Sequence, residues 1–346
     1  MISWLKAHCD AILASVPAQR LLALDALRGL TITGMILVNN PGSWNYVYGP
    51  LRHAQWHGWT VTDLIFPFFI VIVGMSLQFS LQRQHNQGKN SLPKSQLIRH
   101  AATRSLKLFG LGLFLALFYF NFADPAYSYI EQKLLNLRWL GVLQRIGLVY
   151  FATMLIVLYC GTRGRLAWLG GLCLVYLLAM WYLPYQDSQG NTFSGLLLSG
   201  NSFAAWLDHT VLGVNHLYYR TATPFAFDPE GIWSTLPATA SCLSGVLLAL
   251  SACIWLCDIK RWRRWSAPFV VFGANAILFF MLAGIIARAL VMIPVGDGLL
   301  KGWLFSRLFQ PLLGNLNGSL AFALVFLGLS YLLMHWCYRR GLIFRV

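Results

Sequence analysis

Runs of mostly apolar residues, each long enough to cross a lipid bilayer, recur along this chain and restrict its fold more than any other feature. A membrane-spanning helix needs about 20 such residues. In lipid, helices satisfy every backbone N–H and C=O group within the segment itself. The alternating pattern of about 10 residues that marks a membrane β-strand is not found. The predicted spans cover residues 22–40, 59–81, 103–122, 139–160, 166–185, 233–257, 267–291 and 318–337.

The composition agrees with a membrane protein. Only 11% of the 346 residues are charged and 58% are hydrophobic, whereas a soluble domain has about 25% charged residues. We therefore predict an all-α, polytopic membrane bundle of about eight transmembrane helices, forming a single domain over residues 1–346. The net charge of +15 would suggest nucleic acid as the partner of a soluble protein. In a membrane protein, basic residues instead mark cytoplasmic loops, so we expect no nucleic-acid partner.

The basic residues are concentrated in alternate loops, and this asymmetry predicts the orientation. One side carries most of them, including the run Lys260, Arg261 and Arg263 and the pair Arg339 and Arg340 near the C-terminus. The rule that basic loops stay inside places both termini in the cytoplasm. The loops around residues 41–58 and 186–231 then lie outside, in a periplasm or lumen. Membrane lipid is an expected partner, and a homodimer stays open.

A short polar stretch at residues 51–63 holds the best candidates for chemistry. It contains His53 and His57, and it ends at Asp63 in the first turn of a predicted span. An imidazole exchanges protons near neutral pH, and a neighbouring carboxylate can hold it in one tautomer. The alternatives are a helix-capping role for Asp63 and an interfacial aromatic belt for the histidines, beside the tryptophans of the same loop. No further metal ligand stands at helical spacing, so we expect no metal.

Two polar features frame the first span. Asp25 and Arg28 lie at positions i and i+3 at its start, where they either form a helix-end ion pair or present the arginine to an anionic ligand from the cytosol. Asn39 lies at its end, next to Asn40 and before Pro41-Gly42. Asparagine there either ends the helix or supplies a carboxamide donor, which acyl transfer needs for a developing oxyanion.

Gln144 and Arg145 lie inside the fourth predicted span. An arginine within a span costs at least about 2.5 kcal/mol on insertion scales, so it usually faces a cavity or a partner. We take both residues as candidates for binding a polar ligand.

Other polar candidates follow later in the chain. His216, Asp228 and Glu230 cluster on the predicted outer side, although Asp228-Pro-Glu-Gly231 is also a good turn and helix start. Asn275 in the seventh span either faces a substrate or joins two helices by a hydrogen bond. We take these four as candidate substrate-binding residues.

Several short strings occur in the order seen in one family of membrane enzymes. Together they resemble the heparan-alpha-glucosaminide N-acetyltransferase family, within the transmembrane acyltransferases, over about residues 20–280. The strings are Leu24-Asp-Ala-Leu-Arg-Gly29, Leu37-Val-Asn39, His53-Ala-Gln-Trp-His-Gly58, Thr60-Val-Thr-Asp-Leu64, Gly141-Val-Leu-Gln-Arg145, His216-Leu-Tyr218, Asp228-Pro-Glu-Gly231 and Gly273-Ala-Asn-Ala276.

The resemblance implies transfer of an acetyl group from cytosolic acetyl-CoA to the amine of a glucosamine-type sugar on the far side of the membrane. The family's proposed catalytic histidine falls on His53, whereas His57 stands where the family often has Asn and receives no role. With Asn39 as the oxyanion donor and Asp63 orienting His53 or the amine, these three form the expected catalytic set. The residues expected to bind acetyl-CoA are Asp25, Arg28, Gln144 and Arg145. Bacterial members of similar length are associated with N-acetylglucosamine, which implies a bacterial inner membrane.

The chain also departs from the family pattern. Two spans that follow the Asp-Pro-Glu-Gly helix in the family, with an Asn-Lys-Asn-Leu-Trp stretch between them, are missing after about residue 245. Losing two spans preserves the in–out order. Three other functions stay open: an amino-sugar transporter, an O-acetyltransferase of an envelope glycan, and an inactive shortened homologue.

Overall fold

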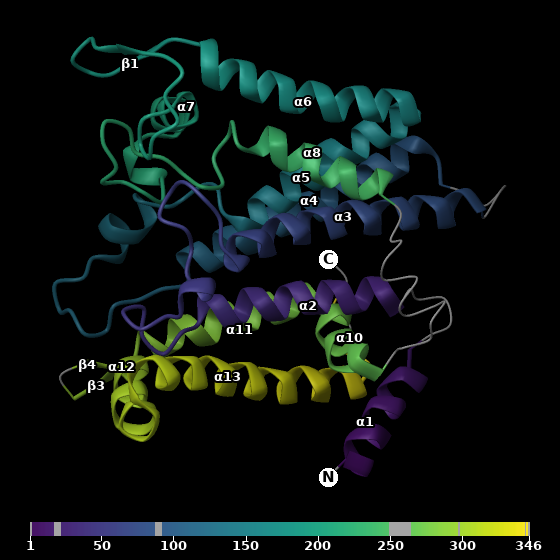
Figure 1. Cartoon of the computed structure of the whole chain (residues 1–346), viewed down its shortest axis with the longest axis vertical. Coiled ribbons are helices and arrows are strands. Elements are labelled where there is room, and N and C mark those ends of the chain that lie inside the picture. The colour runs from purple at the N-terminus through teal and green to yellow at the C-terminus, as the bar shows by residue number, and fades with distance from the viewer. Residues whose placement is uncertain are drawn as a thin grey trace. The chain divides into compact units, whose positions relative to one another are not determined.

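The computed structural model describes residues 2–16, 22–86, 92–248, 264–296, 298–342 and 344. The chain separates into two compact units, each considered by itself below. Unit 1 contains Met1–Ile72, Tyr119–Pro125 and Leu248–Val346, and unit 2 contains Val73–Phe118 and Ala126–Leu247. Figure 1 shows that both are built almost entirely of helices. The single domain predicted over residues 1–346 stays a prediction.

The elements follow in chain order. The helices are α1 (Ile2–Ala14), α2 (Leu22–Asn39), α3 (Val61–Asn86), α4 (Lys94–Leu117), α5 (Val142–Tyr159), α6 (Thr162–Tyr182), α7 (Phe203–Leu212), α8 (Thr235–Leu247), α10 (Ala267–Ala274), α11 (Ala276–Leu290), α12 (Leu300–Leu304) and α13 (Gln310–Arg339). Two short antiparallel hairpins pair β1 (Tyr185–Gln186) with β2 (Thr192–Phe193), and β3 (Pro294–Val295) with β4 (Gly298–Leu299). Single 3-10 turns lie at Gly49–Leu51, Val214–His216 and Arg264–Ser266, and π turns at Ile130–Leu134 and Phe305–Phe309.

Each of the eight predicted spans contains a helix among its described residues, but only some of these helices have the length and hydropathy expected of a membrane crossing. Within the described residues these are α2, α3, α5, α6 and the stretch Leu300–Arg339. Helix α4 is continuous but carries four Lys and Arg residues in its N-terminal part. Helix α8 has only 13 described residues. The predicted all-α fold is therefore confirmed, with several helices long and apolar enough to cross a membrane. The count of eight and the cytoplasmic termini stay predictions.

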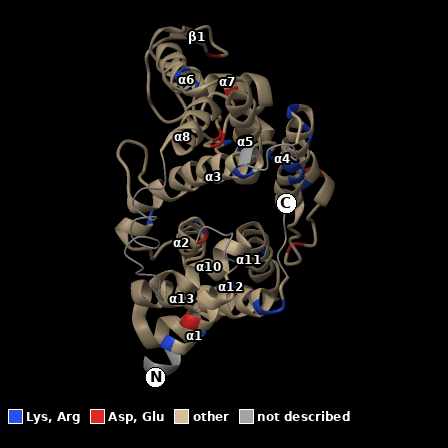
Figure 2. Cartoon of the chain, turned by 90° about the vertical axis from the view of Figure 1, so that its right-hand side faces the viewer, with Lys and Arg blue, Asp and Glu red and all other residues tan. Residues whose placement is uncertain are grey.

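Some sequence expectations fall outside the described residues. The span predicted at 233–257 is described only to residue 248, and the basic residues Lys260, Arg261 and Arg263 lie in the undescribed stretch. Figure 2 shows that most of the described helical ribbon is tan, with few positions coloured as charged residues, as expected for helices that face lipid or one another.

The predicted continuous span at 267–291 is wrong in one respect, because it is two helices. Helices α10 and α11 meet at an angle of 82°. The bend lies at Asn275, whose backbone leaves the helical region with φ −128° and ψ 38°. A polar side chain that forms hydrogen bonds with main-chain groups elsewhere in the chain can stabilise such a break in a helix. An average of hydropathy over the span does not reveal the break.

In unit 1, α2 and α10 pack with their backbones almost in contact. A Cβ atom added at Gly273 would lie 1.8 Å from the carbonyl oxygen of Asp25, and one at Gly29 would lie 1.7 Å from that of Phe269. Small residues allow this approach, which gives membrane helices extensive van der Waals contact.

Unit 2 uses the same principle at two crossings. Helix α3 approaches α8 at Gly74, where an added Cβ would lie 1.9 Å from the carbonyl oxygen of Cys242. Helices α4 and α5 are joined where Ser105 Oγ donates to the carbonyl oxygen of Gly147 at 2.8 Å. Close helix contacts therefore hold this bundle together.

The segment between α6 and α8 folds over a small core of its own within unit 2. Tyr185, Phe203, Phe225 and Phe227 are buried there together. Helix α7 begins where Ser202 Oγ accepts a hydrogen bond from the Ala205 N–H at 3.2 Å, a standard N-cap. This compact segment carries His216 and the Asp228-Pro-Glu-Gly231 turn.

Candidate active site

The loop that follows α2 is attached to α13 within unit 1. The N–H of Gly42 donates to the carbonyl oxygen of Ser319 at 3.1 Å. Ser319 Oγ accepts from the N–H of Ser43 at 3.0 Å and lies 3.1 Å from its carbonyl oxygen. Further along the loop, the hydroxyl of Tyr48 donates to Asn317. These hydrogen bonds therefore fix the start of the loop that carries His53.

His53 and Asp63, which the sequence placed ten positions apart, form a hydrogen-bonded pair. Nδ1 of His53 lies 2.6 Å from Oδ1 of Asp63. The His53 side chain is 64% exposed and that of Asp63 is 27% exposed. The imidazole is thus held on one edge by a carboxylate and is open to solvent elsewhere.

The Asp63 carboxylate is also held by hydrogen bonds from residues at and before the start of α3. Oδ2 of Asp63 accepts from the N–H of Thr60 at 2.8 Å, from the N–H of Ala54 at 3.1 Å, and from Thr60 Oγ1 at 3.1 Å. Thr60 is the residue before α3, so its bond to Asp63 is one half of a capping box. Thr60 Oγ1 also lies 2.7 Å from the carbonyl oxygen of Arg52. The capping role and the contact with His53 coexist in one side chain.

This arrangement sets the tautomer of His53. An ionised Asp63 accepts only, so Nδ1 of the neutral imidazole carries the hydrogen and Nε2 keeps its lone pair. His57 is exposed in the same loop. The pair can therefore take a proton at Nε2 while the carboxylate stabilises the resulting cation.

Asn39 is the last residue of α2 and its side chain is exposed. Its neighbour Asn40 is buried and donates from Nδ2 to the carbonyl oxygen of Ile36 at 2.8 Å. The helix end is thus satisfied by Asn40, and the Asn39 side chain lies at the surface.

Asp25 and Arg28 form the expected i,i+3 contact, with 3.4 Å between Oδ1 and Nη1. Nη1 of Arg28 also lies 3.5 Å from the carbonyl oxygen of Gly273. The Asp25 side chain is nearly buried and that of Arg28 is about one quarter exposed, at 26%. The pair therefore lies beside the α2–α10 crossing.

Asn275 is 1% exposed, and its carboxamide is bonded to the C-terminal residues. Nδ2 donates to the carbonyl oxygen of Leu342 at 2.8 Å, and Oδ1 accepts from the N–H of Phe344 at 3.0 Å. This gives Asn275 a structural role in unit 1, close to the joining role that the sequence left open. Its binding of substrate stays a prediction.

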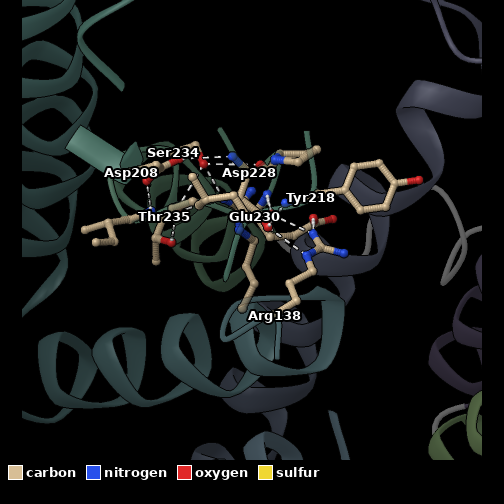
Figure 3. A network of polar contacts seen from close by, with 12 residues as sticks. Arg138, Asp208, Tyr218, Asp228, Glu230, Ser234 and Thr235 are labelled. Atoms are coloured by element: carbon tan, nitrogen blue, oxygen red, sulfur yellow. Dashed lines mark hydrogen bonds and ion pairs between the residues drawn. The ribbon is translucent and has the colours of Figure 1, made fainter. Parts of the chain in front are cut away.

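In unit 2, Asp228 lies at the centre of a buried polar network (Figure 3). Arg138 donates to it twice, from Nε to Oδ2 at 2.7 Å and from Nη2 to Oδ1 at 2.5 Å. The N–H groups of Tyr218 and Glu230 donate to the same carboxylate at 3.1 and 2.9 Å. Since the Asp228 side chain is 0% exposed, it positions its neighbours rather than facing solvent.

Glu230 forms the second acidic contact of Arg138, at Nη2. Burial raises the pKa of the Glu230 carboxyl, and the nearby Arg138 works against that rise. Burial lowers the pKa of Arg138, but Asp228 and Glu230 outweigh it, so the pKa of the guanidinium is raised overall. The guanidinium also lies over the exposed ring of Tyr218, 4.7 Å from its centroid.

Asp208 on α7 contacts the Asp228-Pro-Glu-Gly231 turn. Oδ1 accepts from the N–H of Ile232 at 2.8 Å, and Oδ2 accepts from the N–H of Asp228 at 3.4 Å. A Cβ at Gly231 would overlap this carboxylate at 1.8 Å. Burial raises the pKa of Asp208 to about 6.

Arg145 and Gln144 are both buried at the start of α5. Nη2 of Arg145 donates to the carbonyl oxygen of Gly231 at 3.1 Å and also to Ser234 Oγ. Its buried Nε has no hydrogen-bond partner among the described residues. Gln144 packs tightly against α4, where a Cβ at Gly112 would lie 2.2 Å from Oε1.

His216 is held at the edge of this network. Its Nδ1 lies 2.7 Å from the carbonyl oxygen of Leu137, which assigns the hydrogen to Nδ1 and leaves Nε2 as an acceptor. The ring lies 5.6 Å from that of the exposed Trp139. In the described part of the chain, no group of three or more His, Cys, Asp or Glu side chains could hold a metal ion.

Two residues of this network were missed at the sequence level. Arg138 was one of the few cations on the predicted outer side, and that scarcity was a usable signal. Asp208 was the other, an acid within an otherwise apolar stretch, Phe203-Ala-Ala-Trp-Leu-Asp208. The structure brings Asp228 together with both Arg138 and Asp208, and it joins Glu230 to Arg138. It also brings His53 together with Asp63.

Comparison with known proteins identifies relatives. A family model described as heparan-alpha-glucosaminide N-acetyltransferase, catalytic, matches residues 20–226. The heparan-alpha-glucosaminide N-acetyltransferase of Homo sapiens is 28% identical over 262 residues, and that of Mus musculus is 27% identical over 268 residues. Each alignment covers 66% of this chain but 38% of the relative, so the chain spans less than two fifths of their length.

The family match includes His53, Asp63 and His216, and it ends before Asp228, Glu230 and Asn275. It covers more than half of the 346 residues. The chain therefore belongs to the heparan-alpha-glucosaminide N-acetyltransferase family.

Proposed function

We propose that this protein is a membrane N-acetyltransferase that moves an acetyl group from acetyl-CoA to the amine of a glucosamine-type sugar, with His53 as its base. The observation that carries the proposal is the His53–Asp63 pair, 2.6 Å apart, with the imidazole 64% exposed. Family membership supports the reaction class, since the two relatives are named for acetyl transfer to a glucosaminide.

The reaction needs an unprotonated amine and a stabilised oxyanion. The amine nitrogen attacks the thioester carbonyl carbon, forming the C–N bond, and the C–S bond breaks as the CoA thiolate leaves. Nε2 of His53 takes the proton released from nitrogen, and Asp63 stabilises the imidazolium. That proton then passes to the thiolate. Asn39, exposed at the end of α2, is the proposed donor to the carbonyl oxygen.

A two-step route uses the same residues. Nε2 of His53 attacks the thioester carbon first, and the C–S bond breaks as the CoA thiolate leaves. The sugar amine then attacks the acetyl group on Nε2, the bond to Nε2 breaks, and the proton released from the amine passes to the thiolate. Because Asp63 occupies the Nδ1 edge, Nε2 is the nucleophile in this route as well. An acetylated His53 peptide, found after incubation with acetyl-CoA alone, distinguishes this route from direct transfer.

The proposed acceptor residues are His216, Asp228, Glu230 and Asn275. In unit 2, His216 offers an Nε2 acceptor beside Trp139, and sugars commonly rest an apolar face on such a ring. Asp228 contributes by fixing Arg138 and Glu230 rather than by touching the sugar, because its carboxylate is fully enclosed. The sugar is expected to enter from the periplasm or lumen.

Acetyl-CoA is expected to come from the cytosol, with Asp25, Arg28, Gln144 and Arg145 as its proposed contacts. Arg145 supports this assignment through its buried Nε, which no described residue satisfies. A guanidinium is the usual protein partner for phosphate. The protein is proposed to reside in a bacterial inner membrane, because it resembles bacterial family members of similar length.

The test is the purified protein with acetyl-CoA and glucosamine, followed by mass spectrometry of the sugar. We expect N-acetylglucosamine from the wild type, and a loss of about 10²–10⁴ in kcat for His53→Ala with an unchanged unfolding temperature. Wild-type turnover by a folded His53→Ala variant would remove His53 from the mechanism.

The rival functions give different results in the same material. Uptake of labelled sugar into liposomes without acetyl-CoA would identify a transporter. Acetylation of a hydroxyl rather than an amine in an acceptor screen would identify an O-acetyltransferase. A failure to bind acetyl-CoA in calorimetry would point to an inactive, shortened homologue.

A further inference from the structure

A second candidate site lies in unit 1, between α1 and the last turn of α13. A cavity of about 380 Å³ opens there, within the usual range of about 300–1,000 Å³ for ligand sites. Its polar lining residues are His8, Ser15, His335, Tyr338 and Arg339. None of these belongs to the proposed acetyl-transfer machinery.

The polar groups that line the cavity are mostly hydrogen-bond donors, and one of them, Arg339, is a permanent cation. Two imidazoles and one guanidinium face the cavity, with two hydroxyl groups beside them, and the two remaining lining residues are apolar. None of the described residues that line the cavity carries a carboxylate. Such a set donates hydrogen bonds and attracts anions.

The imidazoles are held close together. The rings of His8 and His335 lie 4.7 Å apart, and that of His335 is stacked on Tyr331 at 5.8 Å. Nε2 of His8 lies 3.0 Å from the Tyr331 hydroxyl. Nδ1 of His335 is buried and has no hydrogen-bond partner among the described residues. A buried polar atom without a partner normally indicates an unseen ligand or water.

The position of the cavity along the predicted span of α13 suggests the source of the anion. It lies at the end of the apolar stretch Leu300–Arg339. Trp336 on the same turn is exposed, and Arg340 lies over its ring at 5.6 Å. Exposed tryptophan and arginine at the end of a span mark the level of the lipid headgroups.

From these observations we propose that the α1–α13 cavity binds a phosphate group, presented by an anionic lipid headgroup or in free form. Arg339 and His335 contact the phosphate oxygens, and His8, Ser15 and Tyr338 complete the site. Bound phosphate bridges α1 and α13 and so fastens the N-terminal helix to the bundle.

The test compares Arg339→Gln with Arg340→Gln, neighbouring arginines of which only Arg339 lines the cavity. Delipidated full-length protein is titrated with phosphatidylglycerol, phosphatidylcholine and inorganic phosphate, and binding is followed by native mass spectrometry and by thermal unfolding. We expect at least tenfold weaker binding of the phosphate-bearing probe in Arg339→Gln and less than a twofold change in Arg340→Gln. His335→Asn should weaken binding in the same way, so the test does not depend on one variant folding.

The probes separate the two sources. Tight binding of phosphatidylglycerol without competition by inorganic phosphate identifies a lipid, whereas tight binding of inorganic phosphate alone identifies a soluble anion. The proposal is overturned if neither probe binds, if phosphatidylcholine binds as tightly as phosphatidylglycerol, or if both arginine variants lose binding equally.

Discussion

At the scale of single residues, Asp63 performs two tasks that one substitution can separate. As a carboxylate it caps α3 and accepts from Nδ1 of His53. In Asp63→Asn the cap largely survives, because the amide oxygen still accepts from Thr60. The amide N–H₂ then faces Nδ1, which favours the tautomer with the hydrogen on Nε2 and removes the base.

We therefore expect Asp63→Asn to lower kcat by about 10²–10⁴ while KM for acetyl-CoA stays within a factor of about three. Steady-state kinetics with glucosamine measures both. His57→Asn is the matched control in the same loop and should retain wild-type activity. Equal losses in both variants would show that the loop, and not the tautomer of His53, is being tested.

Asp208 offers a second prediction at this scale, concerning pH. Its carboxyl has a folded pKa of about 6, against about 3.9 for an unfolded aspartate. Because the folded state holds the proton more tightly, the stability due to Asp208 is complete below about pH 4. It is lost as the pH rises through about 6.

Asp208→Asn should therefore flatten the decline in stability between pH 4 and pH 7. It should also make the protein more stable than wild type at pH 8, by an amount on the order of 2 kcal/mol. Denaturant unfolding across this pH range provides the measurement. Asp187→Asn, at an exposed aspartate whose pKa is lowered by Asn191, should leave the decline in place. An unchanged slope in Asp208→Asn would contradict the assignment.

Single residues were predictable where the chemistry is local. His53 and Asp63 are ten positions apart, on either side of one turn, so their contact followed from the sequence. The contacts of Arg138 with Asp228 and Glu230 join positions about 90 apart, and no periodicity reports such a pairing. For the same reason Asp228 was assigned to a substrate, although its carboxylate is enclosed by Arg138 and by backbone N–H groups.

At the scale of helices, the crossing of α2 and α10 depends on two glycines. An alanine methyl group at Gly273 would lie 1.8 Å from a carbonyl oxygen of α2, so the helices must separate. We expect Gly273→Ala to destabilise the protein by about 1–3 kcal/mol or more.

The matched control is Gly110→Ala in α4, where an added Cβ meets nothing within 4 Å. Removing a glycine from an open helix position favours folding slightly, so Gly110→Ala should be neutral or stabilising. Thermal unfolding in detergent compares the two. If they behave alike, the close approach of α2 and α10 is not what stabilises this crossing.

The positions of the helices were largely predictable, because about 20 apolar residues with polar ends leave few other structures in lipid. The break at Asn275 was not, since a single asparagine inside an apolar run has the same hydropathy whether or not the helix bends.

At the scale of the whole molecule, the asymmetry of basic residues makes a prediction about sidedness. Position 57 lies in the loop expected outside, and position 95 lies at the start of α4, in the part expected to face the cytoplasm. In a background with all seven cysteines replaced, His57→Cys should react with a membrane-impermeant maleimide added to intact cells. Ser95→Cys should react only after the cells are opened. The reverse pattern would invert the topology and the proposed direction of acetyl transfer.

The buried carboxamide of Asn275 links the bend between α10 and α11 to the far end of the chain. Its hydrogen-bonding partners are the main-chain groups of Leu342 and Phe344. Trimming the protein after Arg339 would leave that amide buried and unpaired, at a cost of about 1–3 kcal/mol. A purification tag that is meant to leave the fold unchanged should therefore be added beyond residue 344 without removing any C-terminal residue. Deleting these few residues would destabilise the bend at Asn275 in the middle of unit 1.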